Sequence, residues 1–67
     1  MEIPLAAAER MLKKGNMRVS DQAILEFATL LEETTADIAS EADASAKRAR
    51  RKTVGAEDVR EAKRKIL

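Results

Sequence analysis

Residues 47–52 carry the side chains best suited to bind a charged ligand. Five of these six positions are basic, whereas the net charge of the whole 67-residue chain is only +1. One or two cations suffice to complement the dipole at the C-terminal end of a helix, and further cations there repel one another. The cluster therefore favours a site for a polyanion over a plain helix cap.

The remaining residue types exclude most other chemistry. The chain has no histidine and no cysteine, so the commonest general base, the commonest metal ligand and any thiolate are missing. Ser20, Ser40 and Ser45 have no histidine that could activate them as nucleophiles. The single aromatic residue, Phe27, cannot form a stacking platform for single-stranded bases. We expect no enzymatic activity, no cofactor and no metal site.

The charges occur in blocks along the chain. Residues 20–46 contain seven acidic and no basic side chains, and this acidic block separates the basic cluster from a first segment, residues 1–19, that is also net positive. Such segregation is not typical of a uniformly solvated surface. We expect the acidic block to face away from a bound polyanion.

Three helices and two loops must position these charges. The first helix is predicted over residues 3–14, with Pro4 in its first turn and Gly15 as its stop. The second runs from Ser20 or Asp21, both good N-caps, to about residue 48. The third begins near Ala56 and continues to the chain end. The two connecting segments are short, basic and extended in character.

The second helix is too long for its own chain to cover. At about 29 residues it spans roughly 43 Å, and its large apolar residues recur on one broad stripe. The predicted dimer core consists of Ile24, Phe27, Leu31 and Ile38. Since 13 of the 30 residues in the hydrophobic class are alanine, the chain has little bulk for a core of its own. A second chain is therefore expected to complete it.

Size and hydropathy set the remaining bounds. Sixty-seven residues allow one domain, residues 1–67. No apolar run approaches the length of a transmembrane helix, and the N-terminus lacks a signal-peptide pattern. We predict a cytoplasmic interaction module without membrane association.

Four segments together resemble the archaeal-type histones, which are minimal, tailless histone folds. They are Met1 to Ala6, Arg18 to Asp21, Asp37 to Ala42 and Arg51 to Val59, in that order and with the spacing of the family. The resemblance covers essentially the whole chain. It implies an all-α histone fold of short, long and short helices, and an intertwined head-to-tail dimer. In that dimer the first loop of one protomer lies beside the second loop of the other, facing double-stranded DNA.

The resemblance also implies roles for particular residues. Arg10 matches a minor-groove arginine, Arg18 a first-loop arginine, and Lys52 and Thr53 the second-loop phosphate contacts. Arg51 matches an arginine that pairs with an aspartate, here Asp58, and stiffens the second loop. The full predicted DNA-binding set is Arg10, Lys13, Lys14, Arg18, Ser20, Arg51, Lys52 and Thr53. From the residue alone, an ordinary solvated helix residue is the alternative interpretation of Arg10.

The chain departs from the family's pattern where dimers stack on dimers. The matching positions are Ser45 and Arg48, with Asp58 as a partner that Arg48 could reach on a second dimer. This surface buries little apolar area and gathers charge. We therefore expect weak or absent tetramer stacking.

Other interpretations remain open from the sequence. The leading one is a chromosome-associated, nucleoid protein that binds duplex DNA as a homodimer, without sequence preference, and bends, wraps or compacts it. The alternative is a histone-fold subunit that pairs with a paralogue in a heterodimer and binds little DNA. A plain helical dimerisation module would not require two basic loops. A membrane-surface helix is disfavoured because the long helix is acidic.

Overall fold

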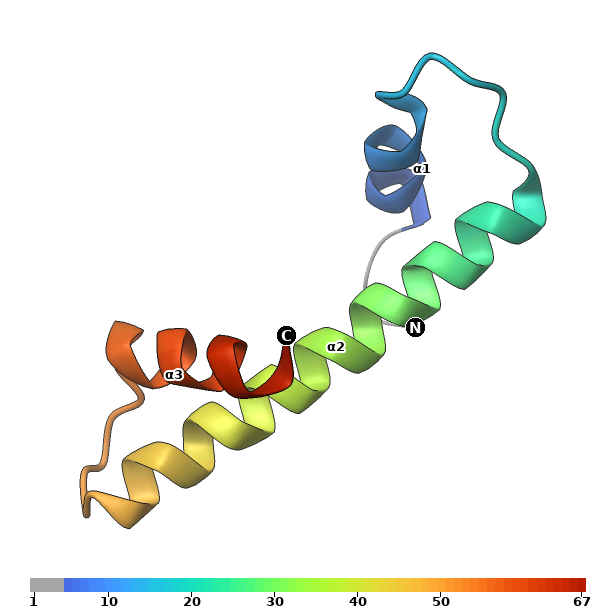
Figure 1. The fold of residues 1–67 in the computed structure, drawn as a ribbon. Helices are drawn as coiled ribbons and strands as arrows, with labels where there is room; N and C mark the ends of the chain where they lie inside the picture. The colour runs from blue at the N-terminus through green and yellow to red at the C-terminus, as the bar shows by residue number, and fades with distance from the viewer. Residues whose placement is uncertain (1–4) are drawn as a thin grey trace. The chain divides into compact units, whose positions relative to one another are not determined.

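A computed structural model describes residues 5–67 of the chain (Figure 1). Within them lie three helices: α1, Leu5–Lys13; α2, Asp21–Arg48; and α3, Ala56–Ile66. The short, long and short order predicted from the sequence is confirmed, and no strand occurs in this range. The predicted start of the first helix at residue 3, with Pro4 in its first turn, lies outside the described residues.

The chain divides into two compact units, Met1–Glu33 and Thr34–Leu67, and α2 contributes one half to each. In the first unit Ala8 of α1 packs with Ile24 and Ala28 of α2, all three buried. Around this cluster lie four larger side chains that are only partly buried: Leu12, Val19, Phe27 and Leu31. The first unit thus has a small apolar core with an incompletely covered edge.

The second unit has no large apolar side chain in its interior. Its buried apolar residues are Ala42 and Ala46 of α2 and Ala62 of α3. Small side chains let two helices approach closely, but each removes little apolar surface from water. The other buried residue here is Asp58, a carboxylate at 2% exposure. Polar contacts therefore take a large share in holding α3 against α2.

Local chain chemistry explains where the helices begin. Ser20 is the N-cap of α2, and its Oγ accepts a hydrogen bond from the Ala23 N–H at 3.1 Å. Gly55 is the N-cap of α3, with extended backbone at φ −101° and ψ 174°. The Gly55 N–H donates to Asp58 Oδ2 at 2.8 Å, which closes the first turn of α3.

The helix α1 ends at Lys13, two residues before Gly15, the stop predicted from the sequence. Neither glycine takes the left-handed conformation with positive φ that often follows a helix. Asn16 takes that conformation instead, at φ 63°. Asparagine tolerates left-handed backbone better than most residues because its short polar side chain bonds locally. The helix closes with an N–H to carbonyl bond from Asn16 to Lys13 at 3.1 Å.

Candidate nucleic-acid interface

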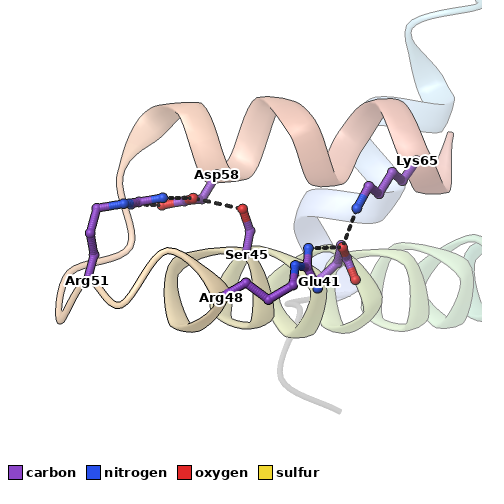
Figure 2. A network of polar contacts seen from close by, with 6 residues as sticks. All are labelled: Glu41, Ser45, Arg48, Arg51, Asp58 and Lys65. Atoms are coloured by element: carbon purple, nitrogen blue, oxygen red, sulfur yellow. Dashed lines mark hydrogen bonds and ion pairs between the residues drawn. The ribbon is translucent and has the colours of Figure 1, made fainter.

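The loop between α2 and α3 is fastened by one buried carboxylate. Arg51 approaches Asp58 with both guanidinium nitrogens, Nη1 to Oδ2 at 2.6 Å and Nη2 to Oδ1 at 2.7 Å (Figure 2). Two parallel bonds of this kind hold arginine in a defined plane. The structure thus brings together the two residues that the resemblance had paired.

Two further hydrogen-bond donors contact the carboxylate of Asp58. Besides the Gly55 N–H, the hydroxyl of Ser45 on α2 donates to Asp58 Oδ1 at 3.0 Å (Figure 2). Arg51 also reaches forward to the Thr53 carbonyl at 3.4 Å, at the long limit for a hydrogen bond. The loop residues between Arg51 and Asp58 are therefore tied to both helices, which fixes the path of the backbone.

The electrostatics of this shell favour the charged form of Asp58. The Arg51 guanidinium, then the Gly55 N–H and the Ser45 hydroxyl hold the pKa of the Asp58 carboxyl far below its usual range, although burial opposes them. The same contact raises the pKa of Arg51. Asp58 is thus an ionised, structural anchor at neutral pH.

A second carboxylate holds the other end of α3. Glu41 Oε1 accepts bonds from Lys65 Nζ of α3 and from Arg48 Nη2 of α2, both at 3.0 Å (Figure 2). These contacts, with Lys65 the stronger, lower the pKa of Glu41. The helix α3 is thus bonded to α2 near its first turn and again near its last.

The residues predicted for a dimer–dimer surface already have partners within a single chain. Its side chain is 2% exposed within a single chain, and its oxygens already accept from Arg51, Gly55 and Ser45. Asp58 therefore faces inward, and Arg48 bonds to Glu41 in the same chain. Of the three predicted stacking residues, Arg48 is exposed, whereas Ser45 is only partly so.

The loop side chains predicted to contact DNA point into solvent. Lys52 and Thr53 are both exposed, and Arg51 is exposed except where it reaches Asp58. Lys52 forms no ion pair within residues 5–67. The buried anchor thus fixes the backbone while leaving a cation and a hydroxyl free for an anionic ligand.

The remaining predicted contacts belong to the first unit. Arg10, Lys13 and Lys14 are exposed on or just after α1, and Lys13 forms an ion pair with Glu9. Arg10 and Lys14, one helical turn apart, line a shallow hollow together with Ala7 and Met11. Arg18 is exposed in the loop before α2. The Ser20 oxygen caps α2, and its hydroxyl proton remains free to donate.

Ion pairing separates the basic side chains into two groups. Seven are neutralised by an acidic neighbour: Lys13, Lys47, Arg48, Arg51, Arg60, Arg64 and Lys65. The others form no ion pair within the described part of the chain: Arg10, Lys14, Arg18, Arg50, Lys52 and Lys63. Four of these six are residues for which the sequence predicts a DNA contact. Free cations are the groups that gain most from a phosphate.

Sequence reasoning missed two long-range contacts and did not single out one exposed cation. Glu41 was counted only as part of the acidic block, because its partner Lys65 lies 24 positions away and no local pattern joins them. The inward bond of Ser45 spans 13 positions and was equally hidden. Arg50 was left out of the predicted DNA contacts. Its position two residues after the end of α2 places it in the same basic loop as Lys52 and Thr53, and this could have been read from the sequence.

No helix within residues 5–67 is long and apolar enough to cross a membrane. The same residues contain no group of three or more acidic, histidine or cysteine side chains that could hold a metal ion.

Comparison with known proteins identifies the class. The profile of the family described as "Histone-like transcription factor (CBF/NF-Y) and archaeal histone" matches residues 1–62. This chain therefore belongs to that family, and its three helices form a histone fold. Membership makes it a DNA-binding, chromosome-associated protein of chromatin.

Two curated relatives are similar over nearly their whole length. "Probable archaeal histone 3" of Methanocaldococcus jannaschii is 48% identical over 64 residues, covering 94% of this chain and 96% of the relative. A subunit of the archaeal histone HAN1 from Thermococcus zilligii is 44% identical over 60 residues, covering 88% and 90% respectively. Both are named as histones rather than as enzymes.

Proposed function

We propose that the chain acts as a homodimer that binds duplex DNA without sequence preference and bends, wraps or compacts it in the nucleoid. The observation that carries the proposal is the set of exposed, unpaired cations on α1 and in both loops. Such cations displace the counterions condensed on phosphates, and this exchange drives binding that ignores base sequence. Helix N-termini and hydroxyls, such as those of Ser20 and Thr53, add fixed donors for phosphate oxygens.

The dimer is supported by what one chain leaves uncovered. Leu25 and Leu30 on α2 are 50% and 57% exposed, and Val59 on α3 is 46% exposed. Burying such a side chain contributes about 1.5–3 kcal/mol, which a single chain largely forgoes here. A second copy crossing α2 head to tail would cover the partly buried stripe of Phe27 and Ile38. It would also bring the first loop of one protomer beside the second loop of the other.

Arg10 is proposed to enter the minor groove. It is exposed on α1 and lies one turn from Lys14, and neither side chain forms an ion pair within residues 5–67. An arginine inserted into a narrow minor groove responds to the shape and potential of the groove rather than to base identity. This contact fits a protein that wraps many sequences.

Pairing with a different histone-fold chain is the alternative to a homodimer. It is favoured by the acidic α2, in which residues 21–46 carry seven acidic and no basic side chains, so that two identical copies repel each other. The relative from Thermococcus zilligii is itself named as a subunit. The molar mass of the purified chain discriminates: twice 7.4 kDa supports the homodimer, and a folded dimer only after mixing with a paralogue supports the heterodimer.

The test of DNA binding is a titration onto a scrambled-sequence duplex at about 50 and 200 mM salt. Lys52→Gln should lower the slope of log affinity against log salt by about 1.8 per dimer, because two phosphate contacts are lost at about 0.9 each. Lys63→Gln is the matched control, since Lys63 is also exposed and unpaired within the described residues but belongs to α3. Equal slopes for all three proteins, or no binding at the lower salt, would refute the proposed interface.

A further inference from the structure

The backbone at the end of α2 contains an arginine in an unfavourable conformation. Arg50 has a φ of 58°, in the left-handed region. Its N–H donates to the Lys47 carbonyl at 3.0 Å, and the Arg51 N–H donates to the Ala46 carbonyl at 3.0 Å. These two bonds form the helix-ending motif whose left-handed residue is usually glycine, because a Cβ there crowds the carbonyl oxygen.

Comparison with Asn16, the other non-glycine residue with positive φ among residues 5–67, shows that arginine is unusual at such a position. Asn16 occupies the same region after α1, but asparagine is among the residues that tolerate it. Arginine has no comparable advantage at the corresponding turn after α2. A bulky residue found where the backbone disfavours it points to a role for its side chain.

The side chain of Arg50 has no role within its own chain. It is exposed and forms no hydrogen bond or ion pair with residues 5–67. In the basic cluster, Lys47 pairs with Asp43, Arg48 with Glu41 and Arg51 with Asp58. Only Arg50 and Lys52 of the cluster remain free, at nearby positions of one loop.

We propose that Arg50 is a further phosphate-binding residue of the second loop, and that it occupies a position suited to glycine because of this contact. The guanidinium presents a planar fork of donors that matches two phosphate oxygens, and it stays charged at any working pH. Together with Lys52 it gives each copy of the loop two free cations. The inference rests on the proposed DNA binding.

Three variants separate the charge of Arg50 from its backbone cost. Arg50→Gly removes the positive charge and the backbone cost of a side chain at a left-handed position. Arg50→Ala removes only the charge. Arg50→Lys keeps the charge and the backbone cost. We expect the Gly and Ala variants to lose the same amount of salt slope, about 1.8 per dimer. Between about 50 and 200 mM salt, the affinity of the unmodified protein should then fall about twelvefold further than theirs. The Lys variant should keep most of the slope.

Thermal unfolding supplies the second readout. The melting temperature should rise in Arg50→Gly and stay nearly unchanged in Arg50→Ala, so that lost binding cannot be ascribed to lost stability. Lys63→Ala controls for removal of any exposed cation. If the unmodified protein binds DNA with a steep salt dependence and the Gly and Ala variants show the same slope of log affinity against log salt, the proposed role of Arg50 is overturned. The proposed DNA binding then still stands. Absence of binding by the unmodified protein would instead overturn the proposed function beneath it.

Discussion

The substitution Ile38→Asp tests whether a second chain completes the core. Ile38 lies on the same face of α2 as Phe27 and Leu31, and it is only partly buried in one chain. Its own unit buries no apolar side chain larger than alanine. If a second copy covers this face, the substitution places one carboxylate from each chain in a desolvated helix crossing.

The magnitude follows from two terms for each copy. Loss of the isoleucine removes about 1.5–3 kcal/mol of burial, and an unpaired carboxylate taken out of water costs several kcal/mol more. Doubled over two chains, the sum is on the order of 10 kcal/mol. The whole stability of a small protein is about 5–15 kcal/mol. We therefore expect Ile38→Asp to be unfolded at micromolar concentration, where we expect the unmodified protein to be a folded dimer.

The assay combines far-ultraviolet circular dichroism with molar mass from sedimentation. Ser40→Asp is the control, because it adds the same charge two residues away at an exposed position. Its nearby acidic residues Asp37 and Asp43 add only a few tenths of a kcal/mol of repulsion each. The control should stay helical and dimeric. A helical monomer of Ile38→Asp, with native ellipticity, would contradict the claim that the fold needs a second chain.

Two more predictions concern the anchor of the second loop and the stacking of dimers. Because its partners lower the pKa of Asp58, the ionised carboxyl stabilises the fold above its unfolded pKa of about 3.9, and this contribution is lost as the pH falls below that value. Asp58→Asn should therefore have a much lower melting temperature than the unmodified protein at pH 7, and the difference in melting temperature should narrow toward pH 2. The control Glu57→Gln, at an exposed position, should keep the melting temperature of the unmodified protein. A difference for Asp58→Asn that stays constant with pH would refute the linkage. On DNA of increasing length, we expect discrete dimers rather than a continuous fibre, since Ser45 and Arg48 already bond within their own chain; protected lengths that grow in regular dimer steps would contradict this.

Local signals were sufficient for the order and bounds of the helices. The spacing of apolar residues, the N-cap Ser20 and the stop at Gly15 all act within a few residues of where they occur. Neighbouring residues determine these features, so the sequence alone predicts them. The pairing of Arg51 with Asp58 came from the family resemblance, since seven positions and a turn separate the two.

Long-range contacts could not be predicted in this way. Nothing near Glu41 in the chain indicates that Lys65 will reach it, and nothing near Ser45 indicates that its hydroxyl will turn inward. These bonds exist only because α3 folds back along α2. The same packing neutralises Lys65 through Glu41, and the closure of the second loop neutralises Arg51 through Asp58.

The sequence by itself determined the three helices and the two basic loops, and it predicted a partner chain. It did so because periodicity, capping and composition are local properties of the chain. The tertiary structure alone decided that Lys65 pairs with Glu41 and that the Asp58 side chain is buried. It also placed Arg50 in a left-handed turn. A long-range ion pair depends on the distance between residues far apart in the chain. The left-handed conformation of Arg50 depends on how the end of α2 closes. Both are set only when the chain folds.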